Sequence, residues 1–148
     1  MKLRALMLAA ALAASASALA HAATPAENKK IVTDFFTMGF TQKHIRQAFM
    51  TYVDPGYIQH NPIAQDGRDN AIAALEPFLN NAPDYSYEVK HVLADGDLVA
   101  VHGWSHNGPT DRGSAIVDIV RLKDGKIVEH WDVIQAIPEK SANAHPMF

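Results

Sequence analysis

The sequence predicts an α+β domain in which helices come first and an antiparallel sheet follows. Up to Pro83, apolar residues recur with helical spacing. From Tyr85 onward they alternate with polar residues, which is typical of strands with one buried face. The dipeptides Asp95-Gly96 and Asp124-Gly125 separate pairs of such segments and favour tight hairpin turns. Helices followed by a run of hairpins gather on one face of an antiparallel sheet.

A single domain is expected from 148 residues, of which 48% are apolar. The formal charge is −3 and no block of like charges occurs. This argues against non-specific binding to nucleic acid or to an anionic membrane, because both need a concentrated basic surface. The chain has no cysteine, which excludes disulfides, thiolate catalysis and thiolate metal sites.

The first 22 residues have the organisation of a secretory signal. Lys2 and Arg4 precede an apolar stretch from Leu6 to Leu19, and Ala20-His21-Ala22 places small residues where a signal peptidase reads them. The alternative is a membrane anchor, but the stretch is rich in alanine and shorter than the roughly 20 residues that span a bilayer. We therefore expect cleavage after Ala22.

Cleavage would leave a domain over residues 23–138 and a loosely held tail over residues 139–148. Export makes ATP or NAD(P)H an unexpected cofactor, since those pools are cytoplasmic, and no Gly-rich phosphate loop of standard spacing is present. The prediction is an exported protein, periplasmic or secreted, with no cofactor and no membrane attachment after cleavage.

Three helices are predicted before residue 83. Thr24-Pro25-Ala26-Glu27 is a capping box with proline at the first helical position, and the helix it starts should end at Gly39. A second helix follows from Thr41, and a third begins near Asp66-Gly67-Arg68 with Pro77 inside it to kink or shorten it. Their buried residues should be Ile31, Val32, Phe35, Phe36, Ile45, Ala48, Phe49, Tyr52, Ile72, Leu75, Phe78 and Leu79.

Between the second and third helices, Asp54-Pro55-Gly56 should form a turn and Tyr57–Asn61 a short extended segment. The rest of the domain reads as four strands. They are expected at Tyr85–Leu93, Leu98–His106, Gly113–Leu122 and Ile127–Ile137.

Asp118 interrupts an otherwise apolar strand face formed by Ile116, Val120 and Leu122. Burying an unpaired charge is costly, so a carboxylate in this position needs a partner or a chemical role. The simpler and commoner alternative is a buried Asp that pairs with a neighbouring Arg or backbone N–H. Asp118 is nonetheless the first candidate for chemistry.

The residue opposite Asp118 depends on the turn at Asp124-Gly125. A two-residue type I′ turn would place Asp118 opposite Trp131, whereas a three-residue loop with a bulge at Gly125 would place it opposite His130. We favour the second register because it puts Asp118, His130 and Asp132 on one face and an apolar set on the other. That apolar set is Val117, Ile119, Ile127, Trp131 and Val133.

Other histidines could join this group. His102 shares a strand face with Trp104, and His60 ends a short extended segment. Histidine and aspartate suit zinc, iron or manganese, but no spacing specific to a metal motif is present, so no metal is expected. Proton transfer uses the same residue types without a metal. The side chains expected to converge on one cavity are His60, His102, Asp118 and His130, walled by Phe35, Phe36 and Trp104.

Three segments resemble the SnoaL-like polyketide cyclase family, part of the nuclear-transport-factor-2-like superfamily that also includes ketosteroid isomerases. They are Tyr57–Pro62, Asp118–Leu122 and, as the most specific, Asp124–Val133. The similarity extends from about Pro25 to Pro138. It implies a cone of three helices packed on a strongly curved antiparallel sheet, with a pocket between them.

The resemblance also implies roles for single residues. Asp118 stands where these enzymes keep a pocket carboxylate, which is a general acid/base in cyclases and a protonated hydrogen-bond donor in ketosteroid isomerases. His60 and Asn61 match the pocket-lining segment in which ketosteroid isomerases place a catalytic Asp. An imidazole and an amide there argue against steroid isomerisation.

We therefore expect an exported enzyme that acts without a cofactor on a small, largely apolar, carbonyl-containing molecule. Aldol cyclisation, isomerisation and dehydration stay open, because a fold does not choose among them. The alternatives are a non-catalytic small-molecule binding protein, a structural role, and a metal-assisted His/Asp site. The expected catalytic residues are Asp118, His60 and His130, and the expected substrate-binding residues are Asn61, His102, Trp104, Asp132, Phe35 and Phe36.

The outer apolar set also predicts a homodimer. An exposed cluster that contains a Trp is larger than a soluble monomer usually tolerates, and all three helices are needed over the pocket. A second copy packed about a two-fold axis would bury the cluster. The alternative is that the tail, with Met147 and Phe148, folds back over it.

Overall fold

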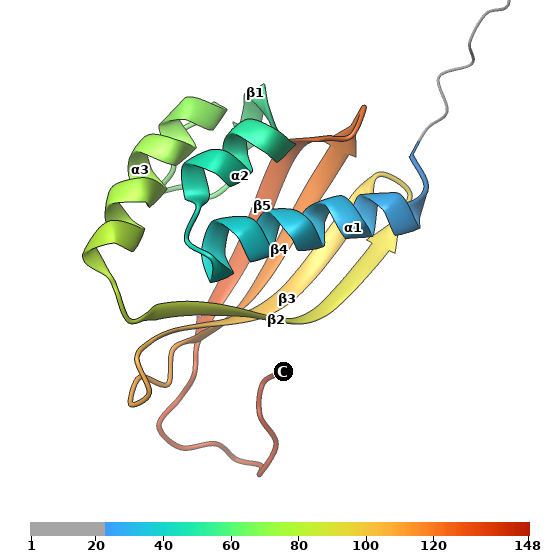
Figure 1. Cartoon of the computed structure of the whole chain (residues 1–148). Coiled ribbons are helices and arrows are strands. Elements are labelled where there is room, and N and C mark those ends of the chain that lie inside the picture. The colour runs from blue at the N-terminus through green and yellow to red at the C-terminus, as the bar shows by residue number, and fades with distance from the viewer. Residues whose placement is uncertain (1–22) are drawn as a thin grey trace, which may run out of the picture.

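Three helices cover one face of a curved five-stranded sheet in the computed structural model (Figure 1). The structure describes residues 23–148, so the expected signal segment lies outside the described residues. Among the residues described, no helix is both long and apolar enough to cross a membrane. The elements are α1 (Pro25–Phe36), η1 (Thr37–Thr41), α2 (Ile45–Tyr52), β1 (Val53–Gln59), α3 (Arg68–Asn81), β2 (Tyr85–Asp95), β3 (Leu98–Asn107), β4 (Ser114–Lys123) and β5 (Lys126–Ala136).

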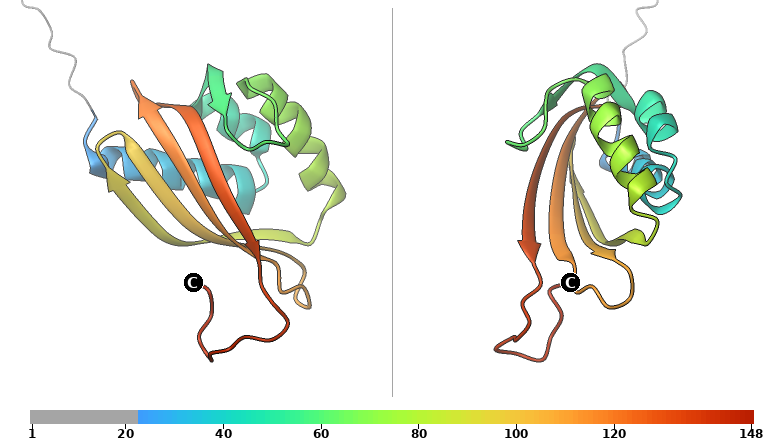
Figure 2. Two further views of the ribbon diagram at one scale, coloured as in Figure 1. Left: turned by 180° about the vertical axis from the view of Figure 1, so that it is seen from behind. Right: turned by 90° about the vertical axis from the view of Figure 1, so that its left-hand side faces the viewer.

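The sheet order is β1-β5-β4-β3-β2, so the last four strands form the predicted antiparallel meander. β1 adds a fifth strand that runs parallel to β5. The views in Figure 2 show the helices on one side of this sheet; we call the opposite side, which carries no helix, the outer face. The α+β fold predicted from the sequence is confirmed, with one parallel edge strand added.

The first helix begins as predicted. Thr24 and Glu27 form the capping box, with the Thr24 N–H donating to Oε2 of Glu27 over 2.7 Å. The helix does not end at Gly39 but continues as the π-helical turn η1. Gly39 is buried there, and a Cβ atom would lie 3.2 Å from Cβ of Ala48 on α2. The glycine therefore permits close helix packing and is not a terminator.

The predicted turn at Asp54-Pro55-Gly56 is wrong, because these residues belong to β1. A proline is tolerated here since β1 is an edge strand, which leaves backbone groups unpaired. The second helix begins at Ile45, later than the expected Thr41.

The third helix is 14 residues long and continues past Pro77 to Asn81. Ile72 and Leu79 are buried as predicted, but Phe78 is 49% exposed. Its ring packs edge-on against Tyr85 at the start of β2, 5.2 Å away, at the border of the core.

The hairpin between β4 and β5 differs from both registers considered. Asp124 and Gly125 have φ values of 51° and 74° and form a two-residue turn, so the expected three-residue loop is wrong. A bulge next to Leu122 then shifts the pairing by one residue, which places Asp118 opposite Asp132 and not opposite His130. Because the bulge adds one residue to β5, His130 pairs with Val120 and still lies on the same face as Asp118.

The bulge also moves Ile127 to the other face of the sheet. Ile127 pairs with Leu122, is only 1% exposed and belongs to the core. Its expected place on the outer face is therefore wrong. Val117, Ile119, Trp131 and Val133 remain on the outer face, and the core lies between the helices and the covered face of the sheet.

Candidate functional site

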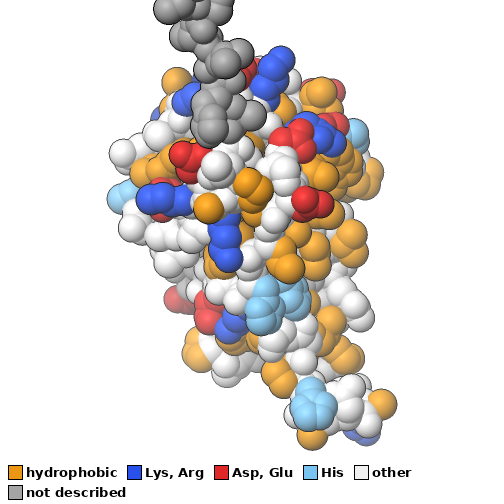
Figure 3. Space-filling model, turned by 90° about the vertical axis from the view of Figure 1, so that its right-hand side faces the viewer, with side chains coloured by type: hydrophobic (Ala, Val, Ile, Leu, Met, Phe, Trp, Pro, Cys, Tyr) orange, Lys and Arg blue, Asp and Glu red, His pale blue; other side chains and the backbone are white. Residues whose placement is uncertain are grey.

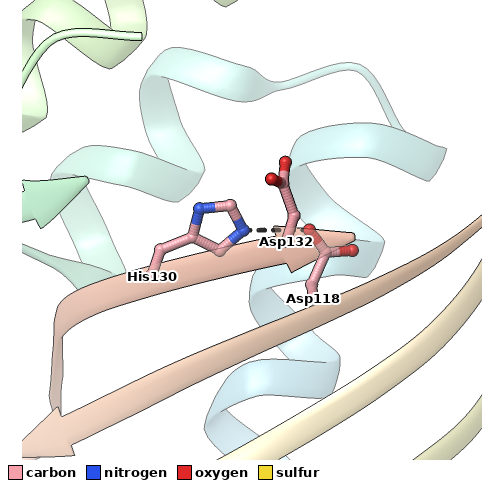
Figure 4. A group of neighbouring side chains, drawn as sticks. All are labelled: Asp118, His130 and Asp132. Atoms are coloured by element: carbon pink, nitrogen blue, oxygen red, sulfur yellow. Dashed lines mark hydrogen bonds and ion pairs between the residues drawn. The ribbon is translucent and has the colours of Figure 1, made fainter. Parts of the chain in front are cut away.

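A polar cluster lies on the helix-covered face of β4 and β5 (Figure 4). Nε2 of His130 is 2.9 Å from Oδ1 of Asp118, and the Asp118 side chain is buried between the sheet and the helices. Asp132 is the third member, and one ligand atom from each of the three lies within 4.8 Å of the others. An acid and an imidazole thus meet where water has limited access.

Tyr87 on β2 reaches across β3 to complete this cluster. Its hydroxyl donates to Oδ2 of Asp118 over 2.6 Å. Its ring stacks on Phe36, with centroids 5.2 Å apart, and also packs on Phe40 of η1. Burial, and then the negative charge of Asp118, raise the pKa of Tyr87 well above its usual range. Tyr87 therefore stays protonated and acts as a fixed donor.

A glycine on β3 makes room for this tyrosine. Gly103 lies beneath the ring, where a Cβ atom would overlap the Tyr87 hydroxyl and ring carbons. Between β2 and β4, only a residue without a side chain lets the phenol pass to Asp118. The need for glycine at this position comes from close packing and not from an unusual φ angle.

Residues from β1 surround the other side of His130. Oε1 of Gln59 is 2.9 Å from Nδ1 of His130, and Nε2 of Gln59 donates to the Tyr57 hydroxyl over 3.0 Å. The Tyr57 ring stacks on the imidazole at 6.3 Å. Burial, and then the charges of Asp118 and Asp132, raise the pKa of Tyr57 above its usual range. Both nitrogens of His130 thus face a partner.

Asn61, just after β1, holds Asp132. Its Nδ2 donates to both carboxylate oxygens of Asp132, over 2.9 and 2.8 Å. Asp132 and Asn61 are half-buried, and Ile134, two residues further along the same face, is 55% exposed. The helix cover therefore ends beyond Asp132.

His60, by contrast, does not join the cluster. Its Nε2 pairs with Oε1 of Glu129 over 2.9 Å, and its ring stacks on Trp131 at 4.7 Å. Trp131 is opposite Ile119 on the outer face. The expectation that His60 points into the pocket is wrong, because the chain turns outward after β1 ends at Gln59.

His102 and Trp104 also lie on the outer face, so their expected place in the pocket is wrong. On β3 it is Val99, Val101 and Gly103 that face the helices, and the alternation of the strand sends the even-numbered residues outward. Trp104 stacks on Phe148, and His102 packs edge-on against the same ring.

Of the two α1 residues expected to line the pocket, Phe36 lies near the polar cluster and Phe35 does not. Phe36 supports Tyr87 and is thus one contact away from Asp118. Phe35 packs in the core against Phe49, with ring centroids 5.1 Å apart. A cavity of about 500 Å³ lies elsewhere, between α2 and α3, and is lined by Lys43, His44, Ile45, Arg46, Gln47, Glu76, Leu79 and Asn80.

Sequence reasoning missed Tyr57, Gln59, Tyr87 and Gly103. Tyr57 and Gln59 belong to the Tyr57–Pro62 segment that carries the family resemblance, but only His60 and Asn61 of that segment were expected at the site. Tyr87 and Asp118 are 31 positions apart and on strands that do not pair, so no local pattern connects them.

Asp118, His130 and Asp132 are also the residues that could hold a metal ion, since imidazole and carboxylates suit zinc, iron or manganese. Each of these side chains is engaged by a neighbour: Asp118 by Tyr87 and His130, and Asp132 by Asn61. A metal ion would have to replace the contact between Asp118 and His130.

Comparison with known proteins gives a match to the SnoaL-like domain over residues 32–130. No match was found among curated proteins. Among solved structures, TsrD from Streptomyces laurentii is 19% identical with a TM-score of 0.62, covering 76% of this chain and 90% of that one.

Two further structures show the same fold. A protein from Jannaschia sp. CCS1, described as a SnoaL-like polyketide cyclase, is 23% identical with a TM-score of 0.63, covering 74% of this chain and 86% of that one. AclR from Streptomyces galilaeus, described as a hydroxylase, is 24% identical with a TM-score of 0.62, covering 76% and 91%. At these identities the likeness establishes the fold alone.

Proposed function

Because the chain belongs to the SnoaL-like family, we propose that it is an enzyme that transfers protons on a small carbonyl compound without a cofactor. The observation that carries this proposal is the pair formed by Asp118 and His130, hydrogen-bonded over 2.9 Å on the helix-covered face. A carboxyl group and an imidazole in contact can take a proton from carbon and return it elsewhere.

The pair can divide the work of enolisation. One member accepts the proton from the carbon next to the carbonyl, while the other offers a hydrogen bond to the enolate oxygen that forms. The proton is then returned at another atom, so the enzyme ends each cycle unchanged. Tyr87 keeps Asp118 oriented throughout, because its hydroxyl stays protonated. This sequence of steps serves cyclisation, isomerisation and dehydration alike.

The surroundings of the pair support a largely apolar substrate. Beyond Asp132 the side chain of Ile134 is exposed on the same face, and Ile116 lies opposite it on β4. Asn61 and Asp132 are polar groups at this end of the cluster, and Tyr85, hydrogen-bonded to Ser105, lies close enough to interact with Asp118. A small molecule with one carbonyl group and an apolar body would match this distribution.

Deuterium exchange tests the proposal without knowledge of the natural substrate. Small enolisable ketones and β-keto esters are incubated with the protein in D₂O, and loss of the α-proton signal is followed by NMR. Asp118→Asn should slow the exchange by roughly 10²–10⁴-fold. Asp97→Asn is the matched control, because Asp97 pairs with Arg121 at an exposed position. Equal rates in wild type and Asp118→Asn would contradict the proposal.

Two other outcomes would redirect the assignment. A ligand that co-purifies from the native host, identified by mass spectrometry, together with no exchange on any probe would favour binding without turnover. Stoichiometric zinc or iron after dialysis would favour a metal-assisted site at Asp118, His130 and Asp132, which the clustering of their ligand atoms makes geometrically accessible.

We also propose that the protein is exported and acts in the periplasm or outside the cell. The support is the organisation of residues 1–22 as a secretory signal. Intact-mass measurement of the protein from its native host should give a chain that starts at Ala23. A chain that retains Lys2 and Arg4 would contradict export by this route.

A further inference from the structure

We infer that Gln59 is a positioning residue that sets which nitrogen of His130 exchanges its proton. The inference deepens the proposed function and rests on it for its catalytic meaning. Gln59 is the last residue of β1 and lies on the opposite side of the imidazole from Asp118. It touches no atom that would react.

The orientation of the Gln59 amide is determined by its neighbours. The backbone N–H of Asn61 can only donate, and it lies 2.9 Å from Oε1 of Gln59. At the other end, Nε2 of Gln59 donates to the Tyr57 hydroxyl over 3.0 Å. The atom that faces Nδ1 of His130 is therefore an oxygen, and an oxygen without a hydrogen can only accept.

It follows that Nδ1 of His130 carries a hydrogen. The variable proton then lies between Nε2 and Oδ1 of Asp118, 2.9 Å apart. Two arrangements are compatible with this contact, a neutral imidazole facing a carboxylic acid or an imidazolium facing a carboxylate. Both hold one shared proton and the same total charge, so the pair can exchange it without a net change in charge.

Without Gln59 a different state becomes available. The imidazole could carry its single hydrogen on Nε2 and donate it to an ionised Asp118, leaving Nδ1 bare. That state lacks the extra proton, so it has no acid to offer an enolate. By accepting from Nδ1–H, Gln59 favours the state in which the pair holds both a base and an acid.

Within residues 23–148, no other group next to this ring can take the same role. The titratable neighbours are Asp118 on β4, Asp132 on β5 and Tyr57 on β1, with Tyr87 and Tyr85 of β2 beyond Asp118. Asp132 is held by Asn61, and the residue of α1 that reaches this region is Phe36, which is apolar. Among the described residues, only Gln59 has a hydrogen bond to Nδ1.

Nitrogen NMR on protein with ¹⁵N-labelled histidine tests the inference directly. At neutral pH, His130 in the wild type should show a protonated Nδ1. Gln59→Leu should give a bare Nδ1, because the acceptor is lost, and Gln59→Glu, which keeps an acceptor, should retain a protonated Nδ1. Gln135→Leu, at an exposed position of β5, is the matched control and should leave the His130 signals unchanged.

Activity provides a second measurement. Gln59→Leu should slow deuterium exchange by about 10- to 100-fold with a shifted pH profile, as expected for loss of a group that orients a catalytic imidazole. A bare Nδ1 in the wild type, or an unchanged Nδ1 in Gln59→Leu, would overturn the inference. If Gln59→Leu does not fold, Gln59→Met, which keeps the length of the side chain without its amide, takes its place, and a protonated Nδ1 in that variant would overturn the inference.

The two proposals can fail separately. The NMR signals need no substrate, so the inference about Gln59 stands or falls on the free protein. Absence of exchange by the wild type would count against the proposed function and would leave the protonation state of Nδ1 as measured.

Discussion

His130 and His60 lie on opposite faces of the sheet and have neighbours of the same two kinds, a carboxylate and an aromatic ring. Each lies 2.9 Å from a carboxylate, Asp118 for the first and Glu129 for the second, and each stacks on an aromatic ring. Their surroundings differ: the His130 side chain is 13% exposed and the His60 side chain 41%. Water weakens the exposed pair, whereas the covered pair interacts in a medium of lower polarity.

The comparison shows why a histidine next to an acid is insufficient evidence of a site. Gln59 holds the second nitrogen of His130, and Tyr87 holds the second oxygen of Asp118. Around His60, Glu129 is instead shared with Arg121 at the surface. Burial and complete hydrogen bonding, more than residue type, distinguish the candidate site from a surface ion pair.

The outer face has its own aromatic cluster, part of which the tail covers. Phe148 stacks on Trp104 at 5.4 Å, and Nζ of Lys90 lies 4.9 Å from the Phe148 ring. Figure 3 shows histidine side chains among hydrophobic and charged ones on the side of β2 and β3. The tail leaves Val133 70% exposed and Val117 37% exposed, so a dimer through β4 and β5 stays a prediction.

The largest effect is expected at His130, and the same substitution at His60 provides the comparison. His130→Gln should slow deuterium exchange by roughly 10²–10⁴-fold, because the base or its acid partner is lost. His60→Gln should keep a rate close to wild type, since its ring lies on the outer face against Trp131. Equal losses in both variants would remove the distinction between the faces.

The next effect concerns oligomeric state. Val133→Glu or Trp131→Glu should convert a dimer to a monomer, because a carboxylate without a partner is costly to bury in an interface. Light scattering of the mature protein at micromolar concentration measures this. Phe148→Ala is the control and should leave the dimer intact, because Phe148 packs over β3. A monomeric wild type would contradict the prediction.

A smaller effect, on stability, is expected at Gly103. Gly103→Ala should lower the free energy of unfolding by about 1–3 kcal/mol, because the added methyl group overlaps Tyr87. Urea denaturation measures the change. Gly56→Ala is the matched control and should stay within about 0.5 kcal/mol, since the nearest atom to its Cβ is the terminal Oδ1 of Asp54, 3.3 Å away, and no ring or backbone lies against it. Similar losses at both positions would argue against a fixed Tyr87.

The smallest effect is expected at alkaline pH. Burial raises the pKa of Tyr85 from 10.0 to about 12. Between these values the folded state binds more protons than the unfolded state, so the stability due to this group is complete below pH 10 and is lost as the pH rises toward 12. Tyr85→Phe should reduce this fall, as measured by urea midpoints against pH. An identical fall in both proteins would contradict the assignment.

The sequence by itself determined the order of elements and the most distinctive residue of the site. Helical and strand periodicity, the Thr24 capping box and the position, although not the type, of the turn at Asp124-Gly125 are local properties, because each depends on residues within one turn or one hairpin. Asp118 was recognisable because it breaks an apolar alternation. That His130 and Asp132 share its face also followed from alternation, although the reasoning assumed a register that does not occur.

Only the tertiary structure decided which polar residues meet. The bulge in β5 brought Asp132 opposite Asp118 and moved Ile127 into the core. No residue in the turn sequence predicts this bulge. His60, His102 and Trp104 turn outward because the path of β1 and the alternation of β3 relative to the helices are set by packing of the whole sheet. Tyr87 reaches Asp118 across β3 only because Gly103 lies between them, a contact among three strands that local sequence patterns do not encode.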